Sequence, residues 1–453
     1  MWKFNAEELA DFARFYGFHY DGINPHALVK EVLIEMERGL EGKSSSLPMI
    51  PSYITPVTRI PPGKTVLALD AGGTNLRASL IYFNENGEAV AQNTSKTPMP
   101  GTNGQLNAND FFSAIAEACI PLLKDAHIEG IGFTFSYPMK ITSDSDGILL
   151  AFSKEVDAPD VVGKEIGKGL RVALAAKDYK YSGPIVLLND TVATLLSGYA
   201  TISPDGEPAR TRNDFKLDKE GSPVIGFILG TGFNTAYPEF SIPKINFKSN
   251  SSPQIIVCET GNFNVHHRGL LDIEYDSTTK NPGGYFLEKA AAGAYLGPLT
   301  LHILKRAIND KVIQFKKSDE LLAMQHFETR FLNEFMHSPL TAQGPIGSLF
   351  APNENDALAA VQYITSIVTE RGALFSASVL AATIERVNAG FEPYYPVRVA
   401  VEGTTYMIYK GMRRSIESYL HQMLYKDKPR PYIVSPVEQA SLFGAAVAAL
   451  SKK

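Results

Sequence analysis

The segment Val66-Leu67-Ala68-Leu69-Asp70-Ala71-Gly72-Gly73-Thr74-Asn75 begins with an apolar run and then turns at two glycines. A second apolar run covers residues 76–83, so the pattern predicts two strands joined by a tight turn. Glycines let backbone N–H groups approach an anion, and turns of this kind form phosphate-binding nests. A carboxylate at this place could hold Mg²⁺, usually through water. From these residues alone, a plain tight turn remains the alternative.

A second segment repeats the pattern: the apolar run 224–229, the turn Gly230-Thr231-Gly232-Phe233-Asn234 and a continuation over 235–237. Two hairpins of one pattern suggest an internal duplication. The strand-like runs 130–135 and 185–188 lie between them, and a helical pattern follows the second run. Strands that alternate with helices favour an α/β fold.

The remaining segments are assigned by periodicity and by Pro/Gly content. We expect helices over the first forty residues and over 284–385, a connector at 44–62, a surface loop at 201–222, a strand at 397–401 and a small-residue helix at 435–453.

Composition excludes several classes of protein. The 453 residues are 44% hydrophobic and 20% charged, which argues against a disordered chain. The formal net charge of −5 gives no basic excess for nucleic acid or an anionic membrane. Two distant cysteines argue against a disulfide scaffold or a cysteine-built zinc site. We therefore expect a cytoplasmic protein with no membrane or nucleic-acid partner. The sequence does not indicate an oligomeric state.

Glycine-bearing turns follow three of the expected strands. The third is Glu402-Gly403-Thr404-Thr405, after the strand at 397–401. The first turn, at 70–75, has neither the Walker nor the GxGxxG spacing, which disfavours both of those families. Three such turns together suit a nucleoside triphosphate bound between the two halves of the chain.

The segment Asn189-Asp190-Thr191 places a carboxylate at a strand-to-helix junction. One reading is a helix N-cap, because Asn and Asp satisfy the unpaired N–H groups there. The other is a general base that takes the proton of an acceptor hydroxyl during phosphoryl transfer. An unperturbed Asp titrates near 3.9 and is ionised at neutral pH.

At this point the sequence resembles the hexokinase family, including glucokinase, of the actin-like ATPase superfamily. The resemblance covers nearly the whole chain. It is carried by LDAGGTNLR at 69–77, IGFTFSYP at 131–138, LNDTVAT at 188–194, GTGFN at 230–234, EYD at 274–276, NPG at 281–283, LEK at 287–289 and GAYLG at 293–297.

The resemblance implies transfer of the γ-phosphoryl group of Mg-ATP to the 6-hydroxyl of a hexose such as glucose, feeding glycolysis. Asp190 would be the catalytic base. The sugar would be held by Ser153, Lys154, Asn189, Asp190, Asn234, Glu259 and Glu288. The nucleotide would be held by Asp70, Gly72, Gly73, Thr74, Asn75, Arg77, Gly230, Thr231, Gly232, Gly403, Thr404 and Ser441. No residue would bind the metal directly, and Asp70 could reach Mg²⁺ through water.

Several residues depart from the family pattern. Ser153 stands where the family has threonine, and Thr260 follows Glu259 where the family has tryptophan. Glu402 replaces the aspartate of the adenosine turn, and the segment around Ser441 is looser than the family's GSGxG. These changes bear on sugar preference and on ATP affinity.

The implied fold has two ribonuclease-H-like lobes with a cleft between them. The smaller lobe would hold 62–188 and the C-terminal helix 437–453; the larger would hold 1–61 and 189–436. A catalytically weak sugar sensor is one rival, and an actin- or chaperone-like ATPase is another. The intact Asp190 and phosphate glycines disfavour the first, and the set of sugar residues disfavours the second.

Overall fold

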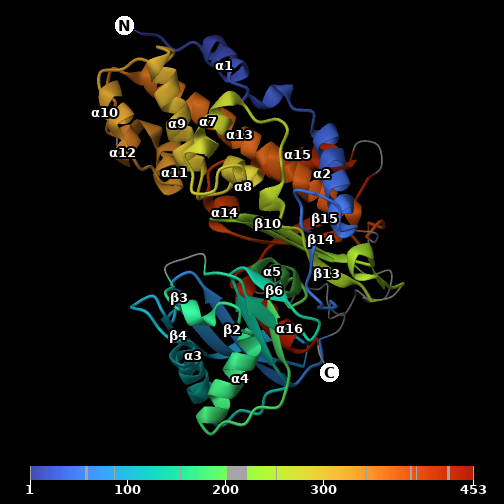
Figure 1. Cartoon of the computed structure of the whole chain (residues 1–453). Helices are drawn as coiled ribbons and strands as arrows, with labels where there is room; N and C mark the ends of the chain where they lie inside the picture. The colour runs from blue at the N-terminus through green and yellow to red at the C-terminus, as the bar shows by residue number, and fades with distance from the viewer. Residues whose placement is uncertain are drawn as a thin grey trace.

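The structure is a computed structural model that describes residues 2–56, 60–85, 87–152, 156–200, 222–250, 252–341, 344–387, 390–393, 395–425 and 429–451. Two β-sheets organise it, one above the other in Figure 1. The expected loop at 201–222 lies almost entirely outside the described residues.

The first sheet has five strands in the order β4-β3-β2-β5-β8. The hairpin β2–β3 and the pair β3–β4 are antiparallel, whereas β5 pairs in parallel with both β2 and β8. We call this sheet and its two outer helices the small lobe. Its elements are β2 (Lys64–Gly72), β3 (Asn75–Phe83), β4 (Ala89–Pro98), α3 (Ala108–Leu123), β5 (Ile131–Phe135), α4 (Ile166–Ala176) and β8 (Ile185–Leu188).

The second sheet has six strands in the order β1-β13-β10-β9-β14-β15. The hairpin β9–β10 and the pair β10–β13 are antiparallel, and β14 pairs in parallel with β9 and β15. The strands are β1 (Ile50–Pro51), β9 (Val224–Leu229), β10 (Phe233–Glu239), β13 (Gln254–Val257), β14 (Val397–Glu402) and β15 (Tyr432–Pro436). With the helices above it, this sheet forms the large lobe.

The two sheets share one topology. In each, a hairpin gains a third antiparallel strand on one side and two parallel strands on the other. The duplication predicted from the two glycine turns is therefore confirmed, and so is the α/β fold class.

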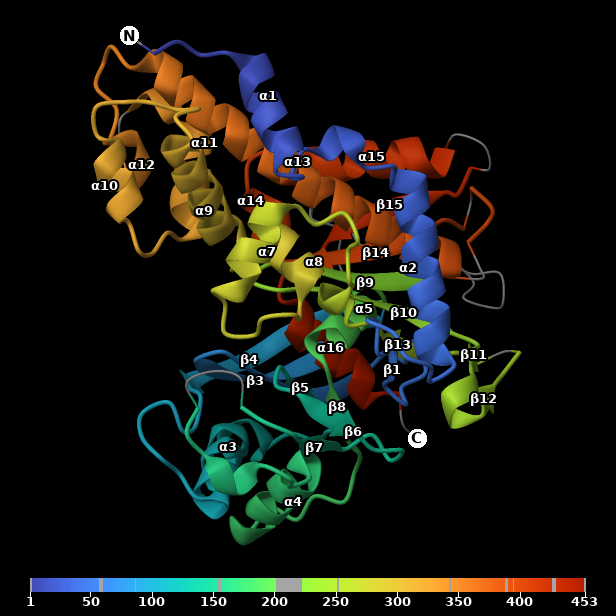
Figure 2. The same ribbon diagram turned by 45° about the horizontal axis from the view of Figure 1, so that its top comes forward.

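Helices α5 (Asp190–Ser197) and α16 (Ala440–Ala449) lie between the sheets, as Figures 1 and 2 show. A hydrophobic cluster joins both helices to residues of both sheets. The small residues of α16 permit this packing. A Cβ placed on Gly444 would lie 1.9 Å from the carbonyl oxygen of Ala193, and one on Gly132 would lie 1.8 Å from that of Ala445. The small-residue pattern therefore reflects direct contact between backbones.

Helices cover the far face of each sheet. The helices of the large lobe, some of which pack on the sheet and others on those helices, are α1 (Ala6–Phe15), α2 (Pro25–Leu40), α7 (Leu270–Ser277), α8 (Phe286–Ala291), α9 (Leu296–Asn309), α10 (Ser318–Ala323), α11 (Thr329–His337), α12 (Gly344–Gly347), α13 (Asn355–Arg386), α14 (Thr404–Ile408) and α15 (Met412–Tyr425). Within the described residues, α13 alone is long and apolar enough to cross a membrane, but 94% of its apolar window is buried inside the structure. Helix α13 therefore lies in the core of the large lobe.

Four strands of the two sheets, β1, β4, β13 and β15, lie where the sequence pattern indicated none. The expected connector contains β1, whose Ile50 and Pro51 pair with Val257 and Ile256 at the edge of the sheet. An edge strand tolerates proline because one side of it needs no hydrogen-bond donor. Strand β15 takes the start of the segment that was expected to be helical from residue 435. Its partner β14 is distant in sequence, so no local pattern reveals the pairing.

Candidate functional site

The glycine turn of the small lobe connects β2 to β3. Gly72 pairs with Asn75, and Asp70 pairs with Arg77 across the hairpin. Arg77 Nη1 lies 3.9 Å from Asp70 Oδ2, a distance at which the two charges attract. Gly73 has a φ of 63°, a left-handed value that few side chains tolerate. The Tyr137 hydroxyl donates a hydrogen bond of 3.1 Å to the carbonyl oxygen of Gly73 and anchors the turn.

The glycine turn of the large lobe connects β9 to β10 and is fixed by its neighbours. The carbonyl oxygen of Gly230 accepts hydrogen bonds of 2.8 Å from Gly293 N and from Thr405 Oγ1. The carbonyl oxygen of Thr231 accepts one of 3.1 Å from Ala294 N. These bonds use the carbonyl groups and hold the turn against the segment 293–294 and against α14.

The third turn contacts the second directly. Gly403 has a φ of 124°, and a Cβ placed on it would lie 2.3 Å from the carbonyl oxygen of Leu229. A Cβ on Gly230 would lie 3.2 Å from Gly403 Cα. Thr404 begins α14 immediately afterwards. Two of the three turns expected at a nucleotide site are therefore in contact, and glycine is required where they meet.

Asn189 and Asp190 begin helix α5. Asn189 is the N-cap, and its Oδ1 accepts a hydrogen bond of 2.8 Å from Thr191 N. Asp190 is the first helical residue, and its Oδ1 accepts from the same N–H at 2.8 Å. The predicted helix N-cap is therefore confirmed, and the capping residue is Asn189. It leaves the Asp190 carboxylate at the positive end of the helix, where a negative charge is stabilised.

Glu259 and Glu288 lie close enough to Asp190 to interact with it electrostatically. Glu259 follows β13 and has a φ of 56°, and Asn234 Nδ2 donates to its Oε1 at 3.0 Å. Glu288 Oε2 accepts a hydrogen bond of 3.0 Å from Phe233 N. The structure thus brings together the four predicted residues Asp190, Asn234, Glu259 and Glu288.

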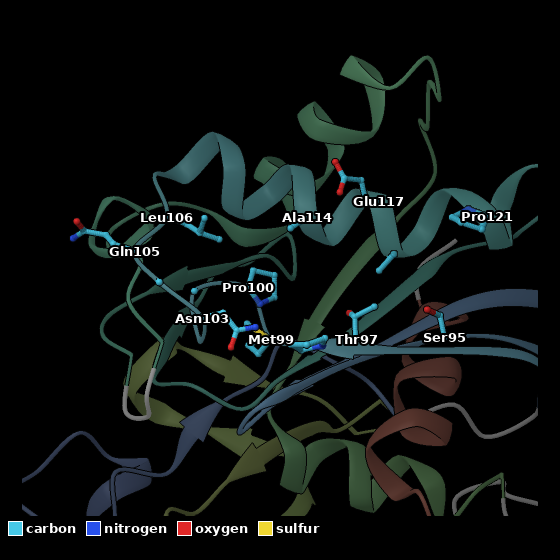
Figure 3. Close-up of a pocket in the computed structure, with 14 residues that line it drawn as sticks. Ser95, Thr97, Met99, Pro100, Asn103, Gln105, Leu106, Ala114, Glu117 and Pro121 are labelled. Carbon is cyan, nitrogen blue, oxygen red and sulfur yellow. The ribbon is translucent and has the colours of Figure 1, made fainter.

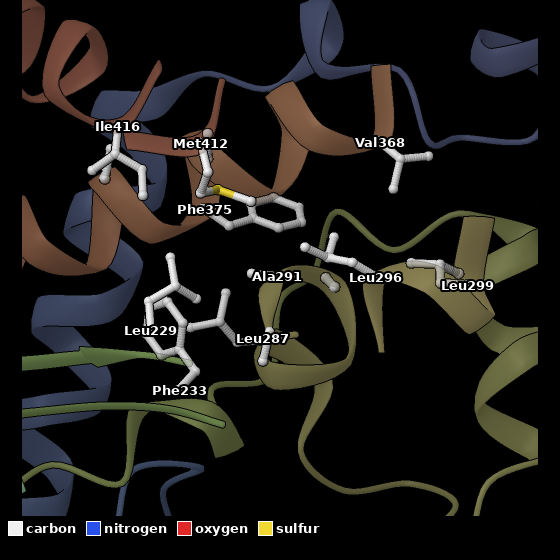
Figure 4. Packing of buried hydrophobic residues seen from close by; sticks show 14 of the residues in the cluster. Leu229, Phe233, Leu287, Ala291, Leu296, Leu299, Val368, Phe375, Met412 and Ile416 are labelled. Carbon is white, nitrogen blue, oxygen red and sulfur yellow. The ribbon is translucent and has the colours of Figure 1, made fainter. Parts of the chain in front are cut away.

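Packing holds α8, and with it Glu288, in place. Figure 4 shows Leu287 and Ala291 of α8 among the apolar side chains between Phe233 of β10 and Phe375 of α13. Leu287 and Ala291 are fully buried. Glycine makes room for the carboxylate, since a Cβ on Gly232 would lie 2.9 Å from Glu288 Oε2.

The carboxyl groups of Glu259 and Glu288 resist ionisation. Burial, with the negative charge of Asp190 second, raises the pKa of Glu259 to about 7. Burial also raises the pKa of Glu288, although the hydrogen bond from Phe233 N opposes the shift. Buried carboxyls that repel one another are common at sites where a ligand supplies the missing hydrogen bonds.

Two further residues of this cluster, Glu402 and Tyr285, were not among the predicted site residues. Burial and then Asp190 raise the pKa of Glu402, at the end of β14, to about 7. Tyr285 precedes α8 with a φ of 55°, and Glu259 and Glu288 add to the effect of burial in raising its pKa. The sequence singles out Glu402 only as the first residue of the third turn, in place of the family's aspartate. Tyr285 carries no such signal.

A cavity of about 400 Å³ adjoins the second and third turns. Two of the predicted nucleotide residues, Thr231 and Thr404, line it together with Gly293, Asn333 and Ile408. A cavity of about 510 Å³ lies elsewhere, between the loop after β4 and helix α3, and Figure 3 shows Pro100, Leu106 and Ala114 around it. None of the predicted site residues lines that second cavity.

Ser153 and Lys154 lie outside the described residues. Ser441 lies on α16, where its carbonyl oxygen accepts a hydrogen bond of 2.8 Å from Thr134 Oγ1 of the small lobe. It does not line the cavity beside Thr231 and Thr404.

Two family models and several known proteins match this chain. One family model described as Hexokinase matches residues 224–451, and another with the same description matches 16–200. Hexokinase-2 of Candida albicans is 28% identical over 461 residues, covering 94% of this chain and 89% of that protein. Hexokinase-1 of Saccharomyces cerevisiae is 28% identical over 475 residues, covering 96% and 90%.

Solved structures show the same fold. A hexokinase from Schistosoma mansoni complexed with glucose has a TM-score of 0.75 and is 23% identical, covering 99% of this chain and 100% of that one. The resemblance seen in the sequence motifs is confirmed by these matches. The chain belongs to the hexokinase family and is an ATP-dependent sugar kinase.

Proposed function

We propose that the protein transfers the γ-phosphoryl group of Mg-ATP to the 6-hydroxyl of a hexose, with glucose as the first candidate. One observation carries this proposal: Asp190 lies at a helix N-terminus beside Glu259 and Glu288, in a lobe whose glycine turn also contributes Asn234 to the same cluster. A phosphate-binding turn and a set of sugar-binding groups thus share one hairpin.

Asp190 is proposed as the base that takes the proton of the 6-hydroxyl during transfer. Its placement at the N-terminus of α5 favours the ionised form, which a base requires. Asn189, Asn234, Glu259 and Glu288 are proposed to bind the other hydroxyls, with Ser153 and Lys154. Each sugar hydroxyl both donates and accepts, so carboxylates and amides can pair with it. An analogue that lacks one hydroxyl leaves a buried polar group unpaired, which selects against it.

The glycine turns are proposed to bind the phosphates through backbone N–H groups, with Asp70, Gly72, Gly73, Thr74, Asn75 and Arg77 from one lobe and Gly230, Thr231 and Gly232 from the other. The cavity of about 400 Å³ beside Thr231 and Thr404 is proposed to receive the nucleoside. Its volume lies in the range of small-molecule sites. Gly403 and Ser441 are proposed to lie near the adenosine.

The donor set fits a magnesium ion held mainly by phosphates and water. Asp70 supplies a carboxylate at the turn, and the described residues hold no group of three or more His, Cys, Asp or Glu side chains that could hold a metal ion. Mg²⁺ commonly binds with one or two carboxylates plus substrate phosphates. When bound, it neutralises charge on the transferring phosphoryl group. The role left to Asp70 is to orient the hydrated ion.

Water competes with the sugar for the phosphoryl group, so a site that assembles only when sugar is bound would suppress ATP hydrolysis. The two lobes carry different parts of the proposed site, and their closure on the sugar would complete it.

A cytoplasmic location is proposed because both cysteines, Cys119 and Cys258, are free and buried.

The test is phosphoryl transfer from Mg-ATP to glucose, mannose, fructose, glucosamine and N-acetylglucosamine, with product and sugar-independent ATP hydrolysis measured in parallel. Sugar-dependent product that disappears when Mg²⁺ is chelated supports the proposal. Absence of product with every sugar contradicts it, and a sugar that still raises the melting temperature would then favour the sensor. Glucose comes first because the Schistosoma mansoni structure is a glucose complex.

A further inference from the structure

Thr194 and Glu402 make a contact to which neither sequence motif nor family resemblance assigns a role. Thr194 lies on α5, one turn after Asp190, and is fully buried. Its Oγ1 lies 3.0 Å from the carbonyl oxygen of Asp190 and 3.3 Å from Glu402 Oε2. A hydroxyl has only one proton to donate. The two acceptors therefore compete for it whenever the Glu402 carboxyl is ionised.

Glu402 links parts of the site that are distant in sequence. It ends β14 and directly precedes Gly403, whose backbone contacts the turn at Gly230. Asp190 and Asp70 add to the burial that raises its pKa, while Thr194 and Arg77 oppose that shift. Glu402 thus interacts with the start of α5 and with the phosphate hairpin of the small lobe.

The chemistry of the pair gives it two arrangements. With Glu402 ionised and near Thr194, the hydroxyl donates to the carboxylate and weakens its bond to the carbonyl oxygen of Asp190. With Glu402 displaced or neutral, the hydroxyl donates to that carbonyl and tightens the first turn of α5. Any movement of the turn at 402–404 therefore changes how the Asp190 backbone is held.

We propose that Thr194 and Glu402 are positioning residues that couple the nucleotide turn to Asp190. A ligand seated on Gly403 and Thr404 alters the position of Glu402, and the Thr194 hydroxyl transmits that change to the backbone of Asp190. This proposal rests on the proposed function, in which Asp190 is the base. Coupling between two sites is reciprocal, so sugar bound at Asp190 must change nucleotide affinity by the same factor.

The length of the Glu402 side chain matters to the proposal. An aspartate at this position, as in the family pattern described above, is one methylene shorter. From the same backbone it cannot keep the 3.3 Å approach to Thr194 Oγ1. Glu402→Asp should therefore remove the coupling while leaving a carboxylate beside the nucleotide turn.

The test uses the whole protein and two kinds of measurement. The first is the dissociation constant of glucose with and without a non-hydrolysable Mg-ATP analogue, which requires no turnover. The second is kcat together with KM for glucose and for ATP. Two variants change the threonine: Thr194→Val keeps the shape and removes the hydroxyl, and Thr194→Ser keeps the hydroxyl. Two change the carboxylate, Glu402→Asp and Glu402→Gln. The double variant combines Thr194→Val with Glu402→Asp.

Thr300→Val is the matched control. Thr300 is also a buried helical threonine, and its Oγ1 donates to the carbonyl oxygen of Leu296 at 2.7 Å in the same i−4 pattern. Among the described contacts, this hydroxyl has no second acceptor. It therefore reports the general cost of removing a buried threonine hydroxyl from a helix.

In the wild type, the analogue should change glucose affinity by about fivefold or more, the lower end of usual coupling factors. Thr194→Val and Glu402→Asp should bring that factor close to one. Thr194→Val should also lower kcat about tenfold, the worth of one hydrogen bond, with little change in KM for glucose. Thr194→Ser should keep the wild-type coupling factor and kcat. The double variant should lose no more coupling and no more kcat than Thr194→Val alone.

Three results would overturn the proposal: a wild-type coupling factor of one, a Thr194→Val enzyme with wild-type coupling and kcat, or an equal loss in Thr300→Val. Failure of the proposed function would look different. In that case the wild type itself would phosphorylate no sugar, whatever the affinity measurements showed.

Discussion

The side-chain amide of Asn234 donates a hydrogen bond of 3.0 Å to Oε1 of Glu259, although 24 residues separate them in the chain. The amide cannot rotate freely, because its Oδ1 accepts from Thr235 N at 2.8 Å and from Thr260 N at 3.3 Å. Glu259 therefore receives a neutral donor in a site that also holds Asp190 and Glu288. When Glu259 is ionised, its carboxylate is hydrogen-bonded by the amide, but no positive charge neutralises it.

Glu259→Gln should stabilise the sugar-free protein at pH 8 and have little effect near pH 5. The folded-state pKa of Glu259 is raised from 4.5 to about 7, so between these values the folded state holds more protons than the unfolded state. The wild-type free energy of unfolding must then fall as pH rises through this window. At pH 8 the gain should be about 1–3 kcal/mol, since one pKa unit corresponds to about 1.4 kcal/mol.

Urea unfolding at pH 5, 6.5 and 8 measures this difference. Glu320→Gln on α10 removes a carboxyl whose side chain is 58% exposed and serves as the control. A Glu259→Gln effect that is the same at all three pH values would contradict the prediction.

Asp190→Ala should abolish sugar phosphorylation while sugar binding remains detectable. The substitution removes the proposed base but leaves Asn189, Asn234, Glu259 and Glu288 to contact the sugar. General-base catalysis typically contributes about 10²–10⁴-fold, so the loss in kcat should be of that order or larger. Turnover assays and glucose titrations by calorimetry provide the two measurements. Near-normal turnover would refute the assignment of Asp190 as the base.

Gly444→Ala and Gly132→Ala should each destabilise the protein by about 3 kcal/mol or more, since overpacking costs about 1–3 kcal/mol and these contacts involve rigid backbone. The added methyl groups would lie 1.9 Å and 1.8 Å from carbonyl oxygens, so α16 would have to move. Gly22→Ala is the control, because a Cβ there has nothing within 4 Å. Urea unfolding compares the three variants. Equal stability of all three would mean that α16 does not pack as the structure shows.

Lys289→Met should cost about 3–5 kcal/mol because it leaves the buried carboxylate of Asp276 without its partner. Lys289 is 5% exposed, and its Nζ also donates to the carbonyl oxygen of Asn281 at 2.7 Å. Adding Asp276→Asn should recover much of the loss, which a double-mutant cycle measures. Lys168→Met breaks an exposed pair with Glu165 and should cost less than about 1 kcal/mol. A similar loss of stability in both lysine variants would show that burial does not make the Lys289–Asp276 pair more costly to break.

Much of the fold was predictable because its signals are local. The two hairpins place an apolar run on each side of a glycine turn, and this pattern predicted β2–β3 and β9–β10 in their correct places. The small residues of α16 predicted close packing without saying against which elements. The short strand β1 could not be predicted, because two residues are too few to show an alternating pattern and its partner lies about 200 residues away.

The candidate site shows the same division. The sequence by itself determined the family, the two glycine turns and the candidate residues Asp190, Asn234, Glu259 and Glu288, because each lies in a short segment with its own pattern. Only the tertiary structure decided that these side chains meet, that burial raises the pKa of Glu259 to about 7, and that Glu402 reaches Thr194. Those properties depend on burial and on charges from distant parts of the chain, which no local pattern of residues records.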